Sequence, residues 1–596
     1  MGGESLARLF WTRVETGGDG PAQRVKRAGE WRTLSWRQLG GAVEEIALGL
    51  LALGRQKGEL VALLAASGPE WVQADFGIFS AGCATVPVYP TYTPEQLAYI
   101  VSDSGAKTLI VEDAEQLAKA LEARGKMGGL EQIVVIREYA GQERSVLTWD
   151  ELRRLGRDSR ERLSSILADR VASTDPDDVA TIVYTSGTTG PPKGVVQTHG
   201  NHMAALRAAA ESTRIAPGDE HLLFLPLAHA FARFEAFMGI HRGLTTAFAE
   251  NLDKVGENLR EVRPDFICSV PRVFEKVYAK ILAGVEAGSP LKRNLFYWAI
   301  GVGRQVSQRQ QARQPIPGGL ALKHRLAHRL VFSKLHRALG GRLRFCFSGG
   351  APLAKEIAEF FHAAGILVLE GYGLTETCPI LAANHPDAFK FGSVGRAIPG
   401  VELQIAPDGE ILARGPNVAT RGYFKNHEAT SEVFEPSGWF HTGDIGRLDE
   451  EGFLFITDRK KDLIVTAGGM NVAPQNIENL LKSDPFISQV MVYGDRRPYP
   501  VALMTLNPEE LRNFATAQGI LASNLPSLAT HPKVLGRVSR IVEEKNAALP
   551  SYAKIKKFAV LPEDFTQDGG ELTPTLKVKR KIVADKYRHV IESLYA

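Results

Sequence analysis

Residues 181–196 have the clearest capacity for chemistry in this sequence. Their apolar ends are typical of buried strands, and three glycines, four hydroxyl residues and one lysine stand between them. Backbone N–H groups, hydroxyl donors and a cation are the groups that bind polyphosphate. The order is not that of a Walker A loop, because Pro191 follows Gly190 and Gly194 follows Lys193. A hairpin loop without a ligand is the alternative. The candidate nucleotide-binding residues are Thr185, Ser186, Gly187, Thr188, Thr189, Gly190 and Lys193.

The bulk composition narrows the classes of partner. The 71 basic residues nearly balance the 67 acidic ones, and a formal charge of +4 is too small for a strong field toward nucleic acid. The cysteines lie far apart without a CxxC pair, which indicates neither a zinc site nor a disulfide framework. The N-terminus lacks a secretion signal, and no apolar run reaches the ~20 residues needed to cross a bilayer. We therefore expect a cytoplasmic protein without a nucleic-acid partner.

The elements that must position these residues follow an α/β pattern. Short apolar runs alternate with helical patterns from residue 34 onward, which predicts layers with buried strands. After Gly400, residues 401–405 and 410–414 predict a hairpin, with Asp408 and Gly409 in its turn. A chain of 596 residues favours more than one domain. The predicted strands include residues 60–64, 108–111, 221–225, 266–270 and 343–347.

A long helical stretch is predicted over residues 273–339, with a break near residues 314–319. Leucines recur at near-helical spacing in its second half, and basic residues occupy the other faces. We interpret this leucine stripe as a face that packs on the protein core. A basic amphipathic helix that lies on an anionic membrane is the alternative. The stripe comprises Leu322, Leu326, Leu330, Leu335 and Leu339.

Residues 181–196 resemble the signature loop of the adenylate-forming superfamily, which includes acyl-CoA synthetases, firefly luciferase and nonribosomal peptide adenylation domains. Other motifs of that family follow in the same order, and the resemblance extends from about Trp36 to Arg580. It implies an α/β fold with two parts. A large multi-layer N-terminal domain (residues 1–458) combines α/β layers with a small β subdomain, and a small mobile α+β C-terminal domain (residues 459–596) follows. The other motifs are residues 348–353, 370–377, 439–446, 458–462, 468–478 and 572–580.

The resemblance implies roles for residues around a bound ATP. Tyr372 is expected to stack on adenine and Thr375 to hydrogen-bond the α-phosphate. Glu376 is expected to bind Mg²⁺, a hard cation that takes carboxylate oxygens. Asp444 is expected to accept hydrogen bonds from both ribose hydroxyls, which suits its two oxygens, with Arg459 beside the ribose. The remaining expected ATP-binding residues are Gly350, Ala351, Glu370, Gly371 and Gly373.

The C-terminal motifs imply catalytic and moving parts. Lys577 falls on the family's catalytic lysine, which bridges the substrate carboxylate and the α-phosphate. Thr575 and Leu576 stand where the family usually has Ser-Gly, so Lys579 is kept as an alternative. Lys461 is expected at the pivot of a domain rotation between two half-reactions. The residues expected to line the thiol channel in the second half-reaction are Gly468, Gly469 and Met470.

The expected substrate is a long-chain fatty acid. Residues 225–235 and 264–277 resemble long-chain fatty acyl-CoA synthetases, with His229 at the wall between the acyl and thiol channels; a core histidine is the alternative. The implied substrates are ATP, a fatty acid and CoA, with Mg²⁺ as cofactor. A fatty acyl-AMP ligase that loads a carrier protein and a CoA ligase for an aromatic acid are the alternatives. Peripheral contact with the inner face of a membrane and a homodimer are left open.

Overall fold

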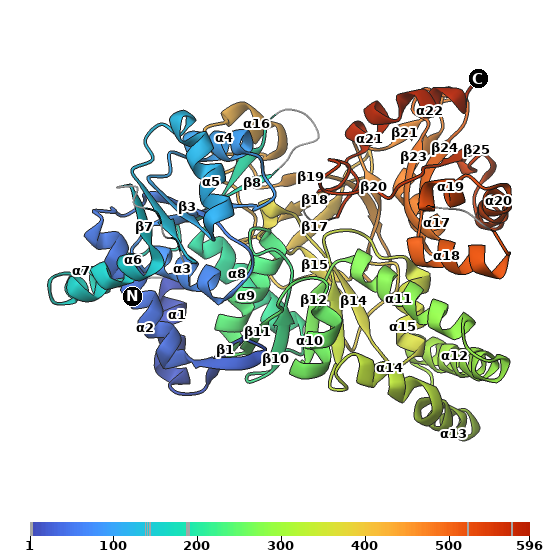
Figure 1. The fold of residues 1–596 in the computed structure, drawn as a ribbon, viewed down its shortest axis with the longest axis horizontal. Helices are drawn as coiled ribbons and strands as arrows, with labels where there is room; N and C mark the ends of the chain where they lie inside the picture. Colours follow the sequence, from blue (N-terminus) through green and yellow to red (C-terminus); the bar gives the residue numbers. More distant parts are fainter. Residues whose placement is uncertain are drawn as a thin grey trace.

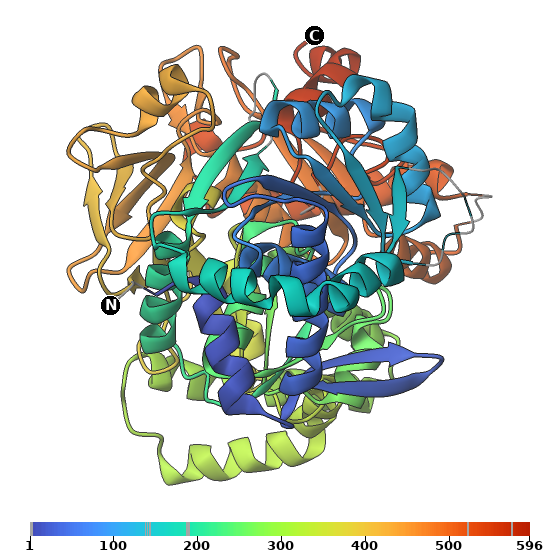
Figure 2. The same ribbon diagram turned by 90° about the vertical axis from the view of Figure 1, so that its left-hand side faces the viewer.

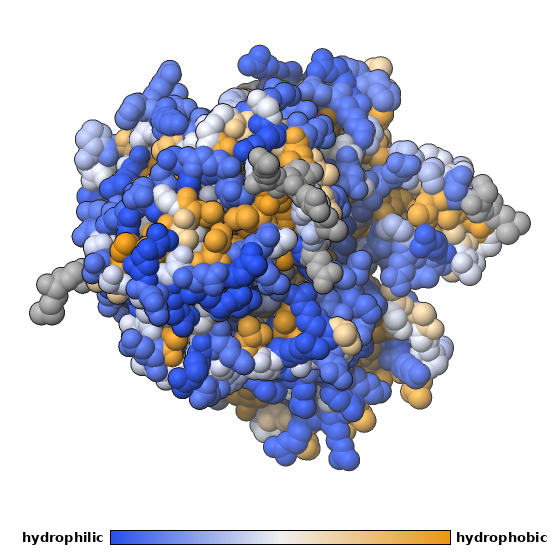
Figure 3. Space-filling model, turned by 60° about the vertical axis from the view of Figure 1, so that its left-hand side comes forward, coloured by the Kyte–Doolittle hydropathy of each residue, from blue (hydrophilic) through white to orange (hydrophobic). Residues whose placement is uncertain are grey.

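The computed structural model describes residues 4–137, 139, 141, 145–185, 191–520, 524–573 and 576–596. The N-terminal part of the chain occupies the left and lower regions of the molecule in Figure 1, and residues after about 460 form a separate lobe at the upper right. Every described helix is too short or too polar to cross a bilayer. The face shown in Figure 3 is mostly hydrophilic, with hydrophobic residues gathered near its centre.

The first sheet is built from the alternating pattern of the N-terminal segment. Its strands are β3 (Leu60–Leu64), β4 (Ala84–Val88), β5 (Thr108–Val111), β6 (Gln132–Val135), β7 (Val146–Thr148), β8 (Val179–Thr185) and β9 (Lys193–Thr198). Their order is β7-β6-β5-β3-β4-β8-β9, and all pairs are parallel except β8 with β9. The Val, Ile and Leu runs are buried because helices cover a parallel sheet on both faces. These helices include α2 (Trp36–Ala52), α3 (Pro69–Ser80), α4 (Pro94–Ser104), α5 (Ala114–Ala123), α6 (Trp149–Asp158) and α7 (Arg160–Ser173).

The second sheet contains the later apolar runs, and its middle strands are parallel. Its order is β16 (Arg396–Ala397), β15 (Ala382–Ala383), β14 (Val368–Tyr372), β13 (Phe345–Ser348), β12 (Phe266–Ser269), β10 (Glu220–Leu223), β11 (Thr245–Phe248), β1 (Pro21–Arg27) and β2 (Glu30–Ser35).

The core lies where helices of the two sheets meet. Phe76 of α3 contacts Phe10 of α1 (Leu6–Gly17), with ring centroids 4.8 Å apart, and Phe237 of α9 (Ala230–Arg242), with centroids 5.7 Å apart. One buried cluster therefore joins both sheets. The other helices around it are α8 (His199–Ser212), α10 (Val255–Val262) and α15 (Lys355–Ala363).

The predicted hairpin is confirmed in a third, small sheet. β17 (Glu402–Ile405) and β18 (Glu410–Arg414) pair antiparallel, followed by β19 (Phe440–Leu448) and β20 (Leu454–Arg459). Gly409 has φ +87°, which is the left-handed turn conformation that glycine adopts without strain. Helix α16 (His427–Val433) precedes β19. This sheet corresponds to the expected β subdomain.

The C-terminal lobe has sheets and a core of its own. β21 (Ile464–Val465) pairs with β22 (Asn471–Val472), and β23 (Ile487–Tyr493), β24 (Val501–Leu506) and β25 (Lys557–Val560) form a second sheet. A buried cluster runs from Ile464 to Ile555 and includes helices α17 (Pro474–Lys482), α18 (Pro508–Ala517), α19 (Leu525–Ala529) and α20 (Pro532–Asn546). Helices α21 (Arg580–Lys586) and α22 (Arg588–Ser593) end the chain. The boundary at residue 459 and the mobility of this lobe stay predictions.

The leucine stripe does not lie on the core as a whole. The helical stretch consists of α11 (Pro271–Glu286), α12 (Pro290–Gln311), α13 (Gly318–Ala327), a π-helical turn (His328–Phe332) and α14 (Ser333–Ala338), so the predicted break is confirmed. Leu335 and Leu339 pack against the core. The packing prediction is wrong for Leu322, Leu326 and Leu330, which are exposed. The reason is that the helix buries the opposite face, through Ala327 and Phe332.

Candidate functional site

The predicted phosphate loop connects β8 and β9. Thr185 and Lys193 are Cα partners at the end of this antiparallel pair, as expected for strands that flank a loop. The Lys193 Nζ lies 5.2 Å from the centroid of the Tyr423 ring, and the lysine is partly exposed. Its ammonium group is therefore beside Tyr423 at the start of β9. Ser186, Gly187, Thr188, Thr189 and Gly190 lie outside the described residues.

The turn after β14 holds the expected magnesium ligand. Glu376 lies in a 3-10 turn (Thr375–Thr377), and its Oε1 accepts a hydrogen bond of 2.9 Å from the Tyr423 hydroxyl. Burial raises the pKa of Glu376 above its ordinary value. The Gln197 side chain of β9 donates to the Thr375 carbonyl at 2.6 Å. This contact fixes the turn beside the strand that carries the phosphate-loop lysine.

Tyr423 was not predicted from the sequence. Its hydroxyl contacts Glu376 and its ring contacts Lys193, so it connects the candidate metal ligand to the candidate phosphate-binding cation. The backbone of Tyr423 also forms a β-bridge with Val195 of β9. No spacing in the sequence connects residues so far apart. The only available signal was the aromatic residue next to Gly422, which gave no indication of its partners.

A glycine is required at one position of the same turn. A Cβ on Gly373 would lie 1.8 Å from the Pro379 carbonyl oxygen, which is far inside any contact distance. A Cβ on Gly371 would meet its nearest neighbour, the Ala382 carbonyl oxygen, at an ordinary 3.6 Å. Gly373 therefore lets the chain fold back tightly beside Thr375, whereas Gly371 does not have this steric role.

The expected ribose-binding carboxylate lies between two other predicted residues. Asp444 of β19 is buried; its Oδ2 accepts a 2.6 Å hydrogen bond from the Tyr372 hydroxyl, and its Oδ1 lies 3.2 Å from Nε of Arg459. Asp444 and Arg459 are Cα partners in the β19–β20 pair, so the sheet register itself brings them together. The contact joins the ends of β14 and β20 to the middle of β19.

Lys577 interacts electrostatically with this carboxylate. It is in a loop closed by the β-bridge between Leu572 and Val578, and its carbonyl accepts from the Thr573 N–H at 2.8 Å. Lys577 is exposed to solvent, but desolvation by the protein around its ammonium group, followed by the positive charge of Arg459, lowers its pKa to about 8. The negative charge of Asp444 raises the pKa of Lys577 and so partly offsets these effects. Lys577 thus lies within electrostatic range of both residues expected around the ribose.

Lys579 has different surroundings. Its backbone N–H donates to the Glu571 carbonyl at 2.7 Å, and it is the N-cap residue of α21. The choice of Lys577 over this alternative stays a prediction.

His229 is the N-cap of α9. Its Nδ1 accepts a 3.2 Å hydrogen bond from the Phe231 N–H, which satisfies one free donor of the first helical turn. Burial and the nearby charge of Lys577 lower the pKa of His229 to about 4, so the ring is neutral at pH 7. A neutral ring suits a channel wall, and His229 is in electrostatic range of Lys577.

The adenine-pocket candidates lie at the ends of β13 and β14. Gly350 has φ +81°, so the turn after β13 uses a conformation that glycine adopts without strain. Ala351 follows it, partly exposed. Glu370 is buried and accepts from the Leu353 N–H at 3.0 Å; burial raises the pKa of Glu370 to about 7. Glu370 therefore fixes the turn from inside and is not directed toward solvent.

The hinge and thiol-channel candidates are not brought to this site. Lys461 is exposed and lies two residues after Arg459, the last residue of β20. Gly468, Gly469 and Met470 form the turn between β21 and β22, and Met470 is exposed. The hydrogen bonds of this turn, including that from Met470 N–H to Thr466 Oγ1 at 3.2 Å, stay within the C-terminal lobe. Lys577 is thus in electrostatic range of Asp444 and Arg459, whereas the described hydrogen bonds of this turn are made within its own lobe.

The arrangement suits chemistry between two anions. Lys193, Arg459 and Lys577 supply positive charge from three separate parts of the chain. Their side chains could offset the charge of a polyphosphate and of an attacking carboxylate. Metal-ligand clusters of three or more His, Cys, Asp or Glu side chains are absent from the described residues.

Comparison of the sequence with models of protein families shows which family has this arrangement of motifs. The model of the AMP-binding enzyme family matches residues 10–424. The chain belongs to the AMP-binding enzyme family. A model of the AMP-binding enzyme C-terminal domain matches residues 461–596. The predicted adenylate-forming enzyme and its long-chain subgroup are confirmed.

Curated members of the AMP-binding enzyme family resemble this chain over nearly its whole length. A long-chain-fatty-acid–CoA ligase, FadD15 of Mycobacterium bovis, is 40% identical over 95% of this chain and 93% of its own. A long-chain-fatty-acid–CoA ligase, ACSBG2 of Xenopus laevis, is 34% identical over 99% of this chain and 84% of its own.

Solved structures of the family share the fold. The adenylation domain of a carboxylate reductase from Mycobacterium chelonae superposes with a TM-score of 0.74 at 23% identity, covering 100% of this chain and 91% of that one. An anthranilate CoA ligase in complex with anthranoyl-AMP has a TM-score of 0.73 at 20% identity, covering 99% of this chain and 98% of that one. The predicted α/β fold class is confirmed.

Proposed function

We propose that this AMP-binding enzyme is a long-chain fatty acid:CoA ligase. It would convert a fatty acid and ATP to acyl-AMP and pyrophosphate, and then form acyl-CoA and AMP with CoA. The observation that carries the proposal is the 3.2 Å contact between Asp444 and Arg459, with Lys577 in electrostatic range of both. The relatives that bear the name of long-chain-fatty-acid–CoA ligase support the choice of acid.

In the first half-reaction, the acid carboxylate attacks the α-phosphorus of ATP and pyrophosphate leaves. Both reactants are negatively charged, so the protein contributes mainly charge compensation and alignment. Lys577 would hold the carboxylate and an α-phosphate oxygen, and Thr375 would donate to the same phosphate. Lys193 and the hydroxyls of the phosphate loop would hold the departing pyrophosphate. Asp444 would exchange its hydrogen bond from Tyr372 for bonds from the ribose hydroxyls.

Glu376 fits the part of a Mg²⁺ ligand. It is one partly exposed carboxylate beside the phosphate-loop strand, and Mg²⁺ commonly takes one or two carboxylates together with substrate phosphates. When it is bound, the ion would neutralise part of the negative charge of the phosphates. The Tyr423 hydroxyl orients the Glu376 carboxylate through its 2.9 Å hydrogen bond.

In the second half-reaction, the CoA thiol attacks the acyl carbon and AMP leaves. We place the turn of Gly468, Gly469 and Met470 at the thiol channel in this step. This requires a rotation of the C-terminal domain about Lys461, because the turn is on the exposed side of its lobe in the present arrangement. Lys577 would leave the site in the same movement. The proposed domain boundary between residues 458 and 459 matches this movement.

The fatty acid would enter beside His229, whose neutral ring can line an apolar channel. Each buried CH₂ contributes about 0.8 kcal/mol, so a channel can hold a long chain without polar recognition. Fatty acids also partition into bilayers, and we include contact with the inner face of a membrane in the proposal. The homodimer stays a prediction.

The test is the formation of AMP and thioester from ATP, Mg²⁺ and CoA across carboxylic acids of increasing chain length and aromatic acids. We expect the highest rate of acyl-CoA formation with long-chain fatty acids. Acyl-AMP that accumulates without thioester would favour the ligase that loads a carrier protein. Turnover confined to aromatic acids would contradict the fatty-acid assignment.

A further inference from the structure

One face of the α13 region is both apolar and open to solvent. Leu322, Leu326 and Leu330, which we call the leucine face, have exposed fractions of 66%, 48% and 40%. Figures 1 and 2 place α13 at the outer edge of the molecule in two perpendicular views. The same helical run buries Ala327 and Phe332 on its other side. The helix therefore has two apolar faces, of which the protein covers one.

The surrounding sequence has a single sign of charge. Residues 287–355 contain 13 Lys and Arg residues and no Asp or Glu, although the whole chain is nearly balanced. Four bases of this segment form ion pairs with carboxylates that lie outside it. They are Arg293, Arg342, Arg344 and Lys355. Among the described residues, the bases next to the leucine face have no carboxylate within ion-pair distance. They are Lys323, Arg325, Arg329, Lys334 and Arg337, all five of them exposed.

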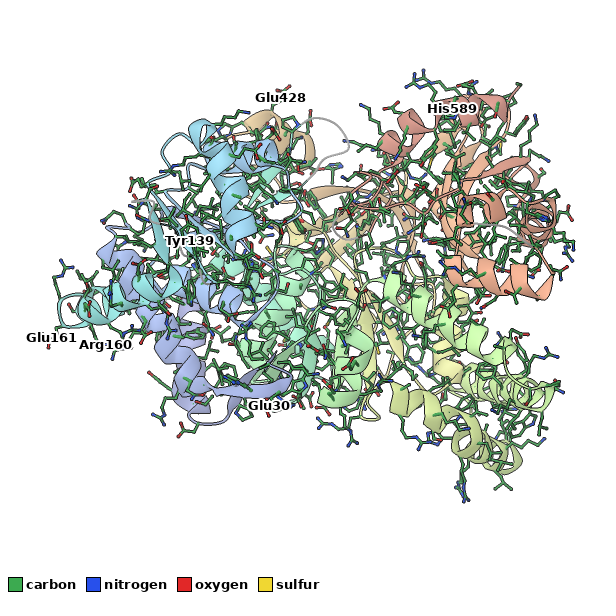
Figure 4. The ribbon with its side chains drawn as sticks, viewed as in Figure 1. Glu30, Tyr139, Arg160, Glu161, Glu428 and His589 are labelled. Carbon is green, nitrogen blue, oxygen red and sulfur yellow. The ribbon has the colours of Figure 1, made fainter. Side chains whose placement is uncertain are left out.

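The bases flank the leucines on both sides. At 100° per residue within α13, Lys323 falls on one side of Leu322 and Leu326, and Arg325 falls on the other. Arg329 and Leu330 follow in the π-helical turn. Figure 4 shows side chains with nitrogen at their tips projecting from the α13 edge, whereas its labelled Glu30, Glu161 and Glu428 lie at other edges of the molecule. An apolar strip between two basic rows is the composition of a helix that lies in a membrane interface.

We propose that the leucine face docks this protein on an anionic lipid bilayer. The three leucines would enter the boundary between head groups and acyl chains, and the bases beside them would contact lipid phosphates while their stems stay on the apolar strip. The exposed leucines and the positive charge together identify the partner. A nucleic acid would match the charge but not the leucines, and a second copy of this chain would bring the same positive charge against itself.

The inference names the surface for the membrane contact in the proposed function, but it does not require ligase activity. Its consequence for that function is that the enzyme would work where its apolar substrate is concentrated. The α13 edge belongs to the N-terminal part of the chain. Docking there leaves the C-terminal lobe free to rotate, since this lobe lies on the opposite side of the α12 region in Figure 1.

The test is co-sedimentation of the full chain with phosphatidylcholine vesicles, with and without phosphatidylglycerol. We expect binding only to vesicles that contain phosphatidylglycerol. Leu322→Ser, Leu326→Ser and Leu330→Ser combined should weaken it at least ~10-fold, because exposed leucines lose their burial in lipid. Lys323→Gln, Arg325→Gln and Arg329→Gln combined should weaken it on the order of 100-fold at low salt. The control is Leu252→Ser, another exposed leucine.

Several outcomes would overturn the proposal. These are equal binding to both kinds of vesicle, no binding by the wild-type chain, or leucine and charge variants that bind like the wild type. A wild-type dimer in light scattering that the leucine variant loses would assign the face to a second copy. Ligation of a short, water-soluble fatty acid is measured on the same samples. Vesicle binding without ligation of any acid would contradict the proposed function while supporting the docking surface.

Discussion

Arg272 is the residue through which we would first test how the C-terminal lobe is held. Its Nη1 donates to the Ser488 carbonyl at 2.7 Å and its Nη2 to the Ser488 Oγ at 2.6 Å, and Asp564 lies 3.5 Å away. Arg272 belongs to α11, whereas both partners belong to the lobe that carries Lys577. The contact should therefore stabilise the orientation in which Lys577 is at the site.

The size of the effect follows from these contacts. A hydrogen bond to a charged group contributes ~1.5–3 kcal/mol, and paired contributions are not additive. Removing Arg272 leaves Asp564 with its hydrogen bonds from Ser488 Oγ and from Thr505 Oγ1, at 2.5 and 2.6 Å. The buried Glu275, which also pairs with Arg272, keeps its 3.4 Å ion pair with Lys482, so neither carboxylate loses its last partner. We therefore expect Arg272→Ala to shift the equilibrium between orientations by about 2 kcal/mol, a factor of roughly 30.

The assay separates the two half-reactions. Acid-dependent exchange of labelled pyrophosphate into ATP reports adenylation, and thioester formation from presynthesised acyl-AMP and CoA reports the second step. We expect Arg272→Ala to lower the exchange rate by up to ~30-fold and to leave thioester formation unchanged or faster. The control is Arg293→Ala, because its 3.6 Å ion pair with Glu286 joins α12 to the end of α11 and does not involve the C-terminal lobe.

An equal loss in both half-reactions would refute this reasoning, because it would assign Arg272 to general stability. Unchanged exchange would also refute it, because the contact would then have no influence on the position of the lobe.

The remaining predictions concern the site itself. Lys577→Ala should abolish most of the pyrophosphate exchange while Lys579→Ala keeps it; the reverse pattern would move the catalytic role to Lys579. The pKa of Lys577 is lowered to about 8, so its charge is present below that pH and lost above it. Exchange should thus fall ~10-fold for each pH unit well above 8, and a flat profile to pH 10 would contradict the assignment. Gly373→Ala should destabilise the protein by at least ~1–3 kcal/mol in denaturant unfolding, because its Cβ would lie 1.8 Å from a carbonyl oxygen. Gly371→Ala should leave stability nearly unchanged, because its Cβ would lie 3.6 Å from the nearest atom. Equal losses of stability in the two variants would show that the turn relaxes around the added Cβ and would contradict the steric argument. Tyr423→Phe should raise the Mg²⁺ concentration needed for half-maximal exchange by ~10–100-fold, and an unchanged requirement would exclude an orienting role.

The local elements of this protein could be predicted because their signals are local. The hairpin around Gly409 is fixed by a turn that favours glycine, and the break near residues 314–319 by prolines and glycines. The leucine stripe was misjudged because periodicity shows that a helix has an apolar face but not what covers it. Both the buried Phe332 side and the exposed Leu326 side of this run are apolar, so pattern alone could not choose between them.

The amino-acid sequence by itself determined the inventory of the site: a phosphate loop, a tyrosine and a glutamate in one turn, a buried aspartate, and a lysine near the end of the chain. It also determined the order of these motifs, which carries the family membership. Only the tertiary structure decided which of them meet. Sheet register brings Asp444 to Arg459, and the packing of the C-terminal lobe brings Lys577 to both. Tyr423 joins Glu376 and Lys193 for the same reason, since contacts between distant segments depend on packing and leave no spacing in the sequence.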